Sequence, residues 1–595
     1  MLIAILALFS ALAAATDEPP RATGFRAPAF VPQVRRVDRP AKARARLRGA
    51  GEAPPARWDS REHGWVSSVK DQGGVGACWA FASCAVLETQ FLKAGRGECD
   101  FSEKNMVNLS GFDISPNDGG NYDMAAAYLL RWGGAVAESN DVYRSTMSTW
   151  TASPMLLPEL HVQNVVWTPT LDSSAAAAQE LKSAIMDYGA VGVAMLWAAS
   201  CFSSSNAYYC TGEEGGEGHA VTVVGWDDAF PNTAFKVDPG INGAWLVKNS
   251  WGNGWGERGY FWVSYKDRWF GNMLPPTVFV LAADDECYDV VRGYDRCGIV
   301  YDVTEHYPSR RYDLQASVFT SSWNEELEAV GVYACEYPCP YEIAIYTNVT
   351  RGAASPVEGG ALACRLSGSF DHAGFTTIRL DAPIPLADTN AFAVVHRQTG
   401  DSRHTLVSCT YVGDCHPTNS PGNCYVGYAT ETGADDWVDA YHEAYDVDVT
   451  DEGWAVCIKA YTRFAKGVAR GDAPSASEDG TRMMSDLADG NWRWLLETSE
   501  TFGPAAGFVG ANGRSLWSNW LLGLDPASAD AHDVKLSIDL SAGSPRVSWR
   551  PDLGAARKYT LYGRDSLVPG GAWRVVDPAD PGADGARFFR VAIGQ

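Results

Sequence analysis

The apolar residues of this chain change their spacing along its length, and that change limits what it can fold into. Over residues 77–93 and 121–132 they return every three or four positions, and glycine follows each run, which predicts two helices. Further along, short apolar runs are separated by turns rich in Gly, Asp and Pro, as strands are. Helices first and strands later predict an α+β unit, followed by units built almost entirely of strands.

The length of 595 residues is enough for several domains. We expect, in order, a signal peptide (1–15), a basic leader (16–53), an α+β domain (54–282), a β-sandwich (287–464), a linker (465–485) and a small C-terminal β module (486–595). The strands expected in the three domains are 191–197, 220–226, 243–248 and 259–265, then 327–333, 341–346, 375–380 and 391–396, then 534–540, 546–549, 559–561 and 588–592. A Trp-rich patch precedes the last group, at Trp492, Trp494, Trp517 and Trp520.

The first fifteen residues are apolar and end in small residues, which predicts a secretory signal with a cleavage site near Ala13 or Ala15. No Lys or Arg precedes the apolar core, so a membrane anchor or a misplaced start is the alternative. The run is short for a bilayer, and no later segment reaches the roughly 18 apolar residues of a membrane helix. We therefore expect a secreted protein without a membrane span.

Charge and cysteine content narrow the partners and the compartment. The formal net charge of −24 repels phosphate backbones, which argues against nucleic acid as a partner. Fourteen cysteines fit an oxidising compartment, and the pairs Cys201 with Cys210 and Cys335 with Cys339 are candidate local bridges. Neither pair has the histidine or second CxxC of a zinc site, so we expect no metal.

The leader is rich in Pro, Ala and Arg, and it lacks apolar periodicity. Two interpretations remain open for it. It is either a disordered linker or a short pro-segment whose basic residues invite proteolysis and pair with the acidic body.

Cys78 is the first candidate for chemistry. It follows a Gly-rich turn and opens the helix expected at 77–93, where backbone N–H groups and the helix dipole are expected to lower the pKa of its thiol. The same N–H groups can hold a developing oxyanion, and Gln72, across the turn, offers a second donor. The alternative for a single cysteine is a buried thiol without a role.

A nucleophilic thiol needs a proton acceptor, and the chain up to residue 282 offers His63, His161 and His219. Only His219 stands at the mouth of an apolar strand, 220–226, which would hold the ring and expose its tip. A histidine that merely satisfies a turn is the plain alternative.

The histidine in turn needs an acceptor for its other nitrogen. Asn249, at the end of the strand expected at 243–248, suits that role without adding a buried charge, and Trp251 can shield the hydrogen bond from water. Asparagine in a Ser- and Gly-rich turn is often only a turn former, so the ordered set of Gln72, Cys78, His219 and Asn249 carries the prediction.

These segments resemble the papain family of cysteine peptidases. The resemblance rests on Trp58-Asp59, Val69-Lys70-Asp71-Gln72-Gly73, Gly76-Ala77-Cys78-Trp79-Ala80-Phe81, Phe101-Ser102-Glu103-Lys104-Asn105, Gly119-Gly120-Asn121, Gly218-His219-Ala220-Val221, Lys248-Asn249-Ser250-Trp251-Gly252, Gly254-Trp255-Gly256 and Gly259-Tyr260. It implies a two-lobed fold of a helical lobe and a β-barrel-like lobe over residues 54–282.

The resemblance also implies residue roles. Cys78 would be the nucleophile, His219 the general acid and base, Asn249 its orienter and Gln72 the oxyanion donor, while Gly119 and Gly120 would bind substrate backbone. No cofactor is implied.

The chain departs from the family pattern at three places. Many members have a disulfide cysteine three residues before the nucleophile, where this chain has Val75, so a substitute bridge between Cys84 and Cys99 is expected. An extra loop at 227–242 is expected to shape the primed side of the cleft. The leader is too short and irregular for a helical inhibitory prodomain, so latency of that kind is not expected.

Residues 287–464 resemble the lectin-like β domain that follows papain-type domains in some secreted bacterial peptidases. The motifs are Tyr288-Asp289, Ala316-Ser317-Val318-Phe319, Leu327-Glu328-Ala329-Val330-Gly331-Val332-Tyr333, Tyr341-Glu342-Ile343-Ala344-Ile345-Tyr346, Ala373-Gly374-Phe375-Thr376-Thr377 and Cys457-Ile458-Lys459-Ala460-Tyr461. The resemblance implies glycan or cell-surface binding, with Trp323, Trp437 and Trp454 as candidates to stack on sugars or as core residues. The C-terminal module faintly resembles terminal β modules of exported bacterial proteins.

Together these observations predict a secreted cysteine endopeptidase acting on proteins or peptides through a Cys78 acyl-enzyme. One alternative is a catalytically idle adhesion protein built on a peptidase scaffold. Another is an exopeptidase, if the loop at 227–242 or the segment 201–210 closes one end of the cleft.

Overall fold

The computed structural model describes residues 22–28, 30–36 and most of 54–464, together with paired strands between residues 535 and 594. Gaps within 54–464 fall at 147–149, 151–152, 154–157, 172–173, 283–287, 289, 304–311, 322–324, 388–389, 399–403, 410–418, 429–434 and 444–452. The predicted signal peptide and linker, the Trp-rich patch and Trp323 lie outside the described residues.

The first unit, residues 54–282, has a helical lobe and a strand lobe, as predicted. The helices are α1 (Cys78–Lys93), α2 (Glu103–Asn108), α3 (Tyr122–Leu130) and α4 (Ala175–Tyr188). The strands are β2 (Arg57–Asp59), β3 (Val162–Trp167), β4 (Val191–Trp197), β5 (Ala207–Tyr208), β6 (Glu217–Asp227), β7 (Ala244–Lys248), β8 (Tyr260–Ser264) and β9 (Thr277–Leu281). Single 3-10 turns lie at Ser60–His63, Glu138–Asn140, Ala199–Cys201 and Asn232–Ala234.

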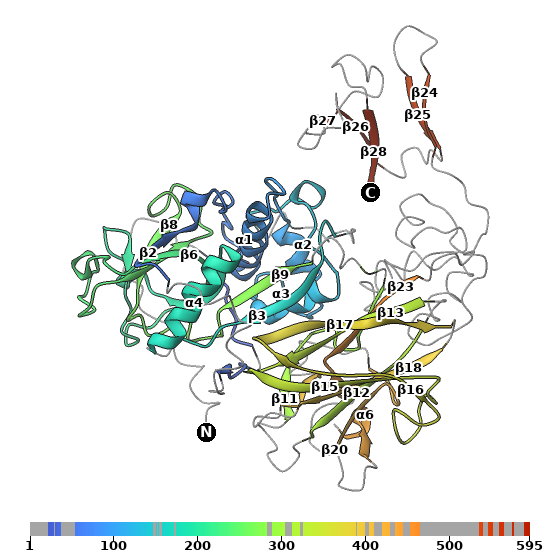
Figure 1. Cartoon of the computed structure of the whole chain (residues 1–595). Coiled ribbons are helices and arrows are strands. Elements are labelled where there is room, and N and C mark those ends of the chain that lie inside the picture. Colours follow the sequence, from blue (N-terminus) through green and yellow to red (C-terminus); the bar gives the residue numbers. More distant parts are fainter. Residues whose placement is uncertain are drawn as a thin grey trace.

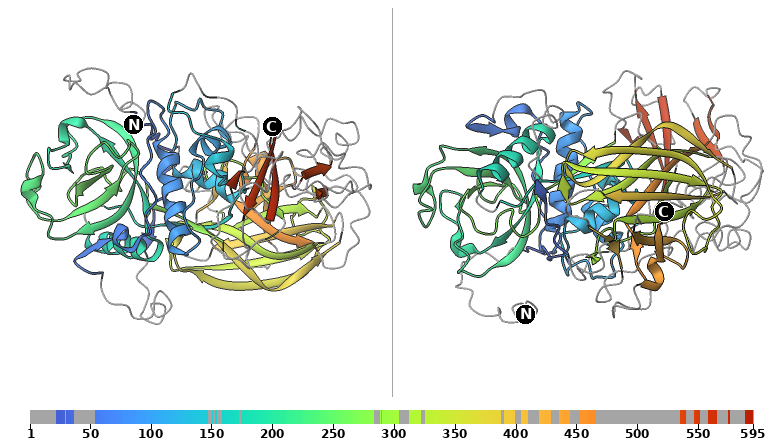
Figure 2. Two further views of the ribbon diagram at one scale, coloured as in Figure 1. Left: turned by 90° about the horizontal axis from the view of Figure 1, so that it is seen from above. Right: turned by 60° about the horizontal axis from the view of Figure 1, so that its bottom comes forward.

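Helix α1 is the centre of this unit. Every residue from Cys78 to Gln90 is buried, because α2 and α3 pack on one side of the helix and β6 and β9 on the other. A helix that is buried on all sides has no polar face, so its sequence lacks an amphipathic pattern and only its small and apolar residues indicate a helix. In Figures 1 and 2, α1 lies between the strand lobe and the β unit that follows.

The second unit, residues 290–464, is almost entirely β, as predicted. Its described strands are β10 (Val290–Arg292), β11 (Tyr301–Asp302), β12 (Leu314–Thr320), β13 (Glu325–Ala334), β14 (Glu336–Tyr337), β15 (Cys339–Thr347), β16 (Ala361–Phe370), β17 (Ala373–Leu386), β18 (Ala391–Gln398), β19 (Leu406–Ser408), β20 (Cys424–Tyr428), β21 (Asp436–Asp439), β22 (Ala455–Val456) and β23 (Ile458–Phe464), and the short helix α6 (Ala440–Glu443) follows β21.

Two sheets of this unit face each other. Strands in the order β16-β15-β18-β12-β20-β21 form one sheet, and β10-β23-β13-β17 form part of the other (Figure 1). Side chains from both sheets, such as Val330, Ile343 and Phe392, are fully buried in a shared core. This is the sandwich that alternating apolar residues predict. Trp454 belongs to that core with no exposed surface, so it cannot stack on a sugar, whereas Trp437 is half-buried.

The two units share a sheet, which the sequence did not predict. Strand β17 pairs antiparallel with β3, so the order β10-β23-β13-β17-β3-β9-β4-β6-β7-β8-β5 continues through both units. At the junction Gly374 has φ +115° and lies so close to β3 that a Cβ there would meet the Val165 carbonyl oxygen at 1.9 Å. Only glycine allows this approach. Apolar alternation identifies strands but not their partners, so the expectation of independent domains missed this junction.

Strands near the C-terminus pair as β24 (Lys535–Asp539) with β25 (Arg546–Arg550), and as β27 (Arg574–Val575), β26 (Lys558–Arg564) and β28 (Phe588–Gly594). The strands predicted in the C-terminal module fall on β24, β25, β26 and β28. Among the residues that the structure describes, no helix is both long and apolar enough to cross a bilayer.

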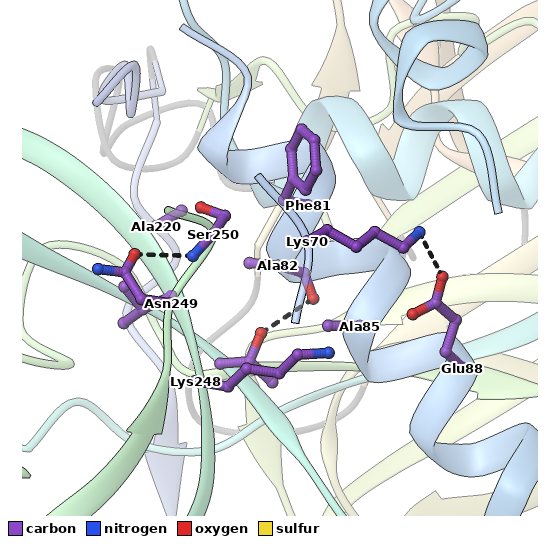
Figure 3. A pocket seen from close by; sticks show the side chains of 11 residues that line it. Lys70, Phe81, Ala82, Ala85, Glu88, Ala220, Lys248, Asn249 and Ser250 are labelled. Carbon is purple, nitrogen blue, oxygen red and sulfur yellow. Dashed lines mark hydrogen bonds and ion pairs between the residues drawn. The ribbon is translucent and has the colours of Figure 1, made fainter. Parts of the chain in front are cut away.

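A buried group of charges joins the two lobes of the first unit, and we call it the interlobe charge cluster: Lys70, Glu88, Glu103, Lys248 and Ser67. Lys70 Nζ lies 2.7 Å from Glu88 Oε1 and 2.8 Å from Glu103 Oε1, and both carboxylates are 1% exposed. From the strand lobe, Lys248 Nζ donates to Ser67 Oγ at 2.8 Å, and Ser67 Oγ donates to Glu88 Oε2 at 2.6 Å. A small cavity beside the cluster is lined by residues of both lobes (Figure 3).

Burial lowers the pKa of Lys248 to about 8, whereas Glu103 and Glu88 outweigh burial and raise the pKa of Lys70 above its ordinary range. Lys70 is therefore the cation that neutralises the two carboxylates. Burial already raises the pKa of Glu103 to about 8, so removal of Lys70 would take away the cation that stabilises the charged forms of both buried carboxylates.

We expect Lys70→Met to lower the free energy of unfolding by about 3–5 kcal/mol, because both glutamates lose their buried cation. Chemical denaturation of the first unit, followed by tryptophan fluorescence, measures the change. Arg365→Met is the matched control. Its ion pair with Glu342 lies on the surface, where Arg365 is 52% exposed, and we expect a loss below about 1 kcal/mol. Equal losses in the two variants would contradict the role assigned to Lys70.

Candidate active site

Cys78 and His219 come from opposite lobes and meet at the interface. Cys78 is the first residue of α1, and its sulfur accepts a hydrogen bond from the Ala220 backbone N–H at 3.3 Å. His219 lies near the start of β6, where it is paired in register with Met195 of β4. The backbone of β6 thus contacts the sulfur at the residue that directly follows His219.

The tautomer of His219 follows from its partner. His219 Nε2 lies 2.8 Å from Asn249 Oδ1, which also accepts from Ser250 N at 2.8 Å. An amide oxygen only accepts, so Nε2 carries the proton and Nδ1 is left as an acceptor. Nδ1 is buried and has no hydrogen-bond partner among the described residues. The structure therefore brings Cys78, His219 and Asn249 together in the order that the sequence predicts.

Aromatic rings cover the His219–Asn249 hydrogen bond. Trp251 stacks on the imidazole with centroids 4.7 Å apart, and Trp197 and Trp255 meet Trp251 edge to face at 4.9 and 5.0 Å. Trp251 thus has the covering position that its sequence context predicts. Trp197 was not predicted, because nothing in the alternation of β4 distinguishes it from an ordinary core residue.

Gln72 is fully buried, and hydrogen bonds fix both the oxygen and the nitrogen of its side-chain amide. Its Oε1 accepts from Ser250 Oγ at 2.6 Å, and its Nε2 donates to the carbonyl oxygens of Val75 and Thr23, both at 2.9 Å. Ser250, which sequence analysis did not select, therefore fixes the orientation of the Gln72 amide and leaves its Nε2 as the donor. The Thr23 carbonyl occupies the position where a substrate carbonyl would meet this donor.

The leader lies in the cleft. Gly120 N donates to Gly24 O at 2.9 Å, Arg26 N donates to Gly120 O at 2.8 Å, and Phe25 N donates to Gly218 O at 3.0 Å. Phe25 and Gly120 pair as parallel strands. Gly119 has φ +84°, and a Cβ there would lie 2.4 Å from the Gly24 oxygen, so the close approach requires glycine. Gly119 and Gly120 thus hold peptide backbone, here that of the leader.

Side chains and a second strand anchor the leader further. Thr23 Oγ1 donates to Glu217 Oε2 at 2.8 Å, and Trp251 Nε1 donates to Ala22 O at 2.9 Å. Downstream, β1 (Arg35–Arg36) pairs in parallel with β14 of the second unit, and Arg36 Nη1 lies 2.7 Å from Glu180 Oε1 of α4. The described residues of the leader are therefore extended and are held against both units.

The covered site is electrically neutral. Burial raises the pKa of Cys78 to about 12, although the N–H groups of Ala220 and Trp79 act in the opposite direction. Burial also lowers the pKa of His219 to about 4 despite its bond to Asn249. The predicted lowering of the Cys78 pKa is therefore wrong for this covered state, because the helix N-terminus contributes less than the loss of water.

Two other expectations need correction. Cys84 and Cys99 are both free thiols, so the substitute bridge is not formed, and the candidate local bridges are not formed either, since Cys201, Cys210 and Cys335 are free thiols as well. Cys84 is fixed within the buried face of α1, whereas Cys99 lies half-buried in the loop beyond that helix. The loop at 227–242 begins at the end of β6 opposite His219, eight residues away, which is roughly 26 Å along a strand. It packs on Trp262 and on Lys182 of α4 and does not shape the cleft.

Comparison with known proteins gives two family matches. Residues 54–273 match the model of the papain family cysteine proteases, and residues 292–462 match that of the lectin-like domain. The cysteine endopeptidase RepA of Oryza sativa subsp. japonica is 34% identical over 209 residues, which is 35% of this chain and 51% of the relative. Procathepsin L of Mus musculus is 34% identical over 221 residues, 36% of this chain and 61% of the relative. The chain thus spans about half to three fifths of the length of these relatives.

One solved structure is similar to both units at once. It contains the cysteine protease and lectin-like domains of Cwp84, a surface layer associated protein of Clostridium difficile, with 21% identity and a TM-score of 0.57 over 70% of this chain and 90% of that one. A Cwp84 structure described as following propeptide cleavage gives a TM-score of 0.58, with 21% identity over 69% of this chain and 99% of that one. At this identity the likeness concerns the fold.

We expect Asn249→Ala to lower kcat/KM about 5- to 150-fold, because the His219 Nε2–H loses its buried acceptor at a cost of about 1–3 kcal/mol. Hydrolysis of a fluorogenic peptide by protein freed of its leader measures the loss. Asn242→Ala, in the loop at the far end of β6, is the matched control and should leave kcat/KM unchanged. An Asn249→Ala variant with unchanged kcat/KM would show that the ring is oriented by other contacts.

Proposed function

We propose that this protein, which carries a papain family cysteine protease domain joined to a lectin-like domain, is a secreted cysteine endopeptidase. It is made in a latent form in which its own leader fills the cleft. The observation that carries the proposal is the hydrogen bond from Ala220 N–H to the Cys78 sulfur across the interface of the two lobes. His219, whose Nδ1 is buried without a partner among the described residues, is the preceding residue of β6. The substrates are proteins or peptides, and the predicted signal peptide supports export.

Acylation requires the cleft to be open to a substrate. His219 Nδ1 takes the Cys78 proton, and the thiolate attacks the scissile carbonyl carbon. The oxyanion that forms accepts hydrogen bonds from Gln72 Nε2 and from backbone N–H at the start of α1. The C–N bond then breaks, and the leaving amine takes the proton from the imidazolium, which leaves a thioester on Cys78.

Water completes the reaction. His219 accepts a proton from water, the hydroxide adds to the thioester carbonyl, and the C–S bond breaks to release the carboxylic acid and restore Cys78. Asn249 keeps the Nδ1 edge of the imidazole toward the sulfur during both acylation and deacylation, because its oxygen accepts the Nε2–H throughout. Trp251 excludes water from that hydrogen bond.

Latency follows from what the leader does to this chemistry. Thr23 takes the Gln72 donor and residues 24–26 take the backbone groups of Gly120 and Gly218, so a substrate has no place to bind. The same coverage favours the neutral thiol and neutral imidazole over the reactive ion pair. Both effects support the proposal that the leader must be displaced or removed before the enzyme can hydrolyse a substrate.

The lectin-like domain supports a second partner, a glycan or a cell surface. Trp454 has no part in it, since the ring lies wholly in the core. We assign this partner only by its class and keep the adhesion protein as an outcome of the tests below.

We expect an epoxysuccinyl thiol-peptidase inhibitor to add once to protein freed of its leader and not at all to its Cys78→Ala variant, and casein hydrolysis to disappear with the label. Intact mass measures the stoichiometry. Cys364→Ala, which removes a half-buried thiol of β16, should keep both label and activity. If folded wild-type protein and folded Gly24→Val protein neither take the label nor cleave casein, the peptidase proposal fails and the adhesion protein replaces it.

Gly24→Val tests latency. Gly24 has φ +113°, and a Cβ there would lie 2.3 Å from the Gly76 carbonyl carbon, so valine must lift the leader. We expect the rate of Cys78 labelling to rise at least about tenfold, since roughly 1.4 kcal/mol of lost leader binding suffices for that. Gln33→Ala, at an exposed position of the leader, is the control and should label at the wild-type rate. Equal rates in all three proteins would show that the leader does not limit access.

A further inference from the structure

Two buried thiols that the mechanism does not use lie close together beside the aromatic wall, which is formed by Trp197 and Trp251 next to His219. Cys201 ends a 3-10 turn just after β4, and Cys210 follows β5. Their sulfur atoms and a carboxylate oxygen of Glu214 all lie within 4.8 Å of one another. Both thiols are free in this structure, and both residues are nearly inaccessible, at 4% and 0% exposure.

The surroundings hold the two sulfurs near each other. Cys210 N donates to Asp267 Oδ2 at 2.9 Å, and Cys201 N donates to Ala198 O at 2.9 Å. Between them, the Tyr208 hydroxyl donates to Leu196 O at 2.7 Å and accepts from Ala198 N at 2.9 Å. The short distance is therefore built into the fold rather than left to two free side chains.

Glu214 explains why a metal ion is the weaker occupant of this cluster. Its carboxylate already accepts from the Cys210 thiol at 3.1 Å, from Thr211 N at 3.1 Å and Oγ1 at 2.8 Å, and from the N–H groups of Gly212 and Glu213 at 2.8 and 2.9 Å. A cation would have to displace several of these bonds. Glu214 itself is exposed, so the cluster lies directly beneath the surface.

We propose that Cys201 and Cys210 are a redox pair that closes into a disulfide in an oxidising compartment. With a disulfide oxidant such as oxidised glutathione, one protein thiolate attacks the glutathione disulfide and releases one glutathione thiol. The second protein thiolate then attacks the mixed disulfide and releases the other. Two protein thiols lose two protons and two electrons, and one glutathione disulfide takes them up and becomes two glutathione thiols.

The bond would lock the wall that covers the catalytic histidine. Trp197 stacks on Tyr208, which lies between the two cysteines in sequence, with centroids 4.9 Å apart. Trp197 in turn meets Trp251 at 4.9 Å, and Trp251 stacks on His219. A closed pair fixes the segment 201–210 against Trp197, so oxidation stabilises the wall while Cys78 must remain reduced.

The test uses the full chain and a readout that does not need peptidase activity. The folded protein is incubated with excess oxidised glutathione, free thiols are then alkylated, and the peptides are identified by mass. We expect a linked pair of peptides holding Cys201 and Cys210. In Cys210→Ser we expect glutathione to remain trapped on Cys201, because the resolving thiol is gone. Cys364, half-buried on β16, serves as the internal control and should not enter a link with either residue.

A thermal measurement gives the second arm. Closing a ten-residue loop should raise the melting temperature of the first unit by about 5–10 °C on oxidation, and the Cys201→Ser/Cys210→Ser variant should lose this shift. Alkylation of both residues after oxidation would overturn the proposal. Protection of both thiols by added Zn²⁺ without a sulfur–sulfur link would overturn it too and would assign the cluster to a metal. Neither result bears on Cys78 labelling, so failure here is distinguishable from failure of the proposed function.

Discussion

The interlobe charge cluster is the contact on which the geometry of this molecule depends. The proposed nucleophile stands on α1 and the proposed base on β6, so their distance is set by how the lobes meet and not by either element alone. Lys70 and Lys248 approach Glu88 from the two lobes, one directly and one through Ser67. Buried charges tolerate few arrangements, because each must keep its partners. The cluster thus fixes one relative position of the lobes, and with it the meeting of Cys78 and His219.

The leader binds along the same interface between the two lobes. It satisfies the polar groups that a substrate would satisfy, and it removes the water that a thiolate and an imidazolium need. Its downstream part pairs with β14 of the lectin-like domain and contacts Glu180 of α4. The strand junction at β3 and β17 joins the unit that carries α4 to the unit that carries β14. The lectin-like domain is therefore part of the platform on which the leader is held.

Several features were readable from local sequence because their causes are local. A Gly-rich turn before an apolar helix placed Cys78 at a helix start, and strand alternation placed His219 at a strand mouth. Other features depend on partners far away in the chain. The pairing of β3 with β17, the free thiols of Cys84 and Cys99, and the position of the loop at 227–242 could not be read from spacing. Helix α4, a run of alanines after Ser174, was missed because its apolar face is narrow.

The sequence by itself determined which residues could do chemistry and which elements carry them, because residue type and periodicity act within a few positions of the chain. It placed Gln72, Cys78, His219 and Asn249 in order and predicted an α+β unit followed by a sandwich. The tertiary structure alone decided what surrounds them: the leader in the cleft, the neutral state of the covered pair, the wall formed by Trp197 and the single sheet through both units. The physical reason is that burial and hydrogen-bond partners depend on segments far apart in the chain, and no local pattern records which of these segments will meet.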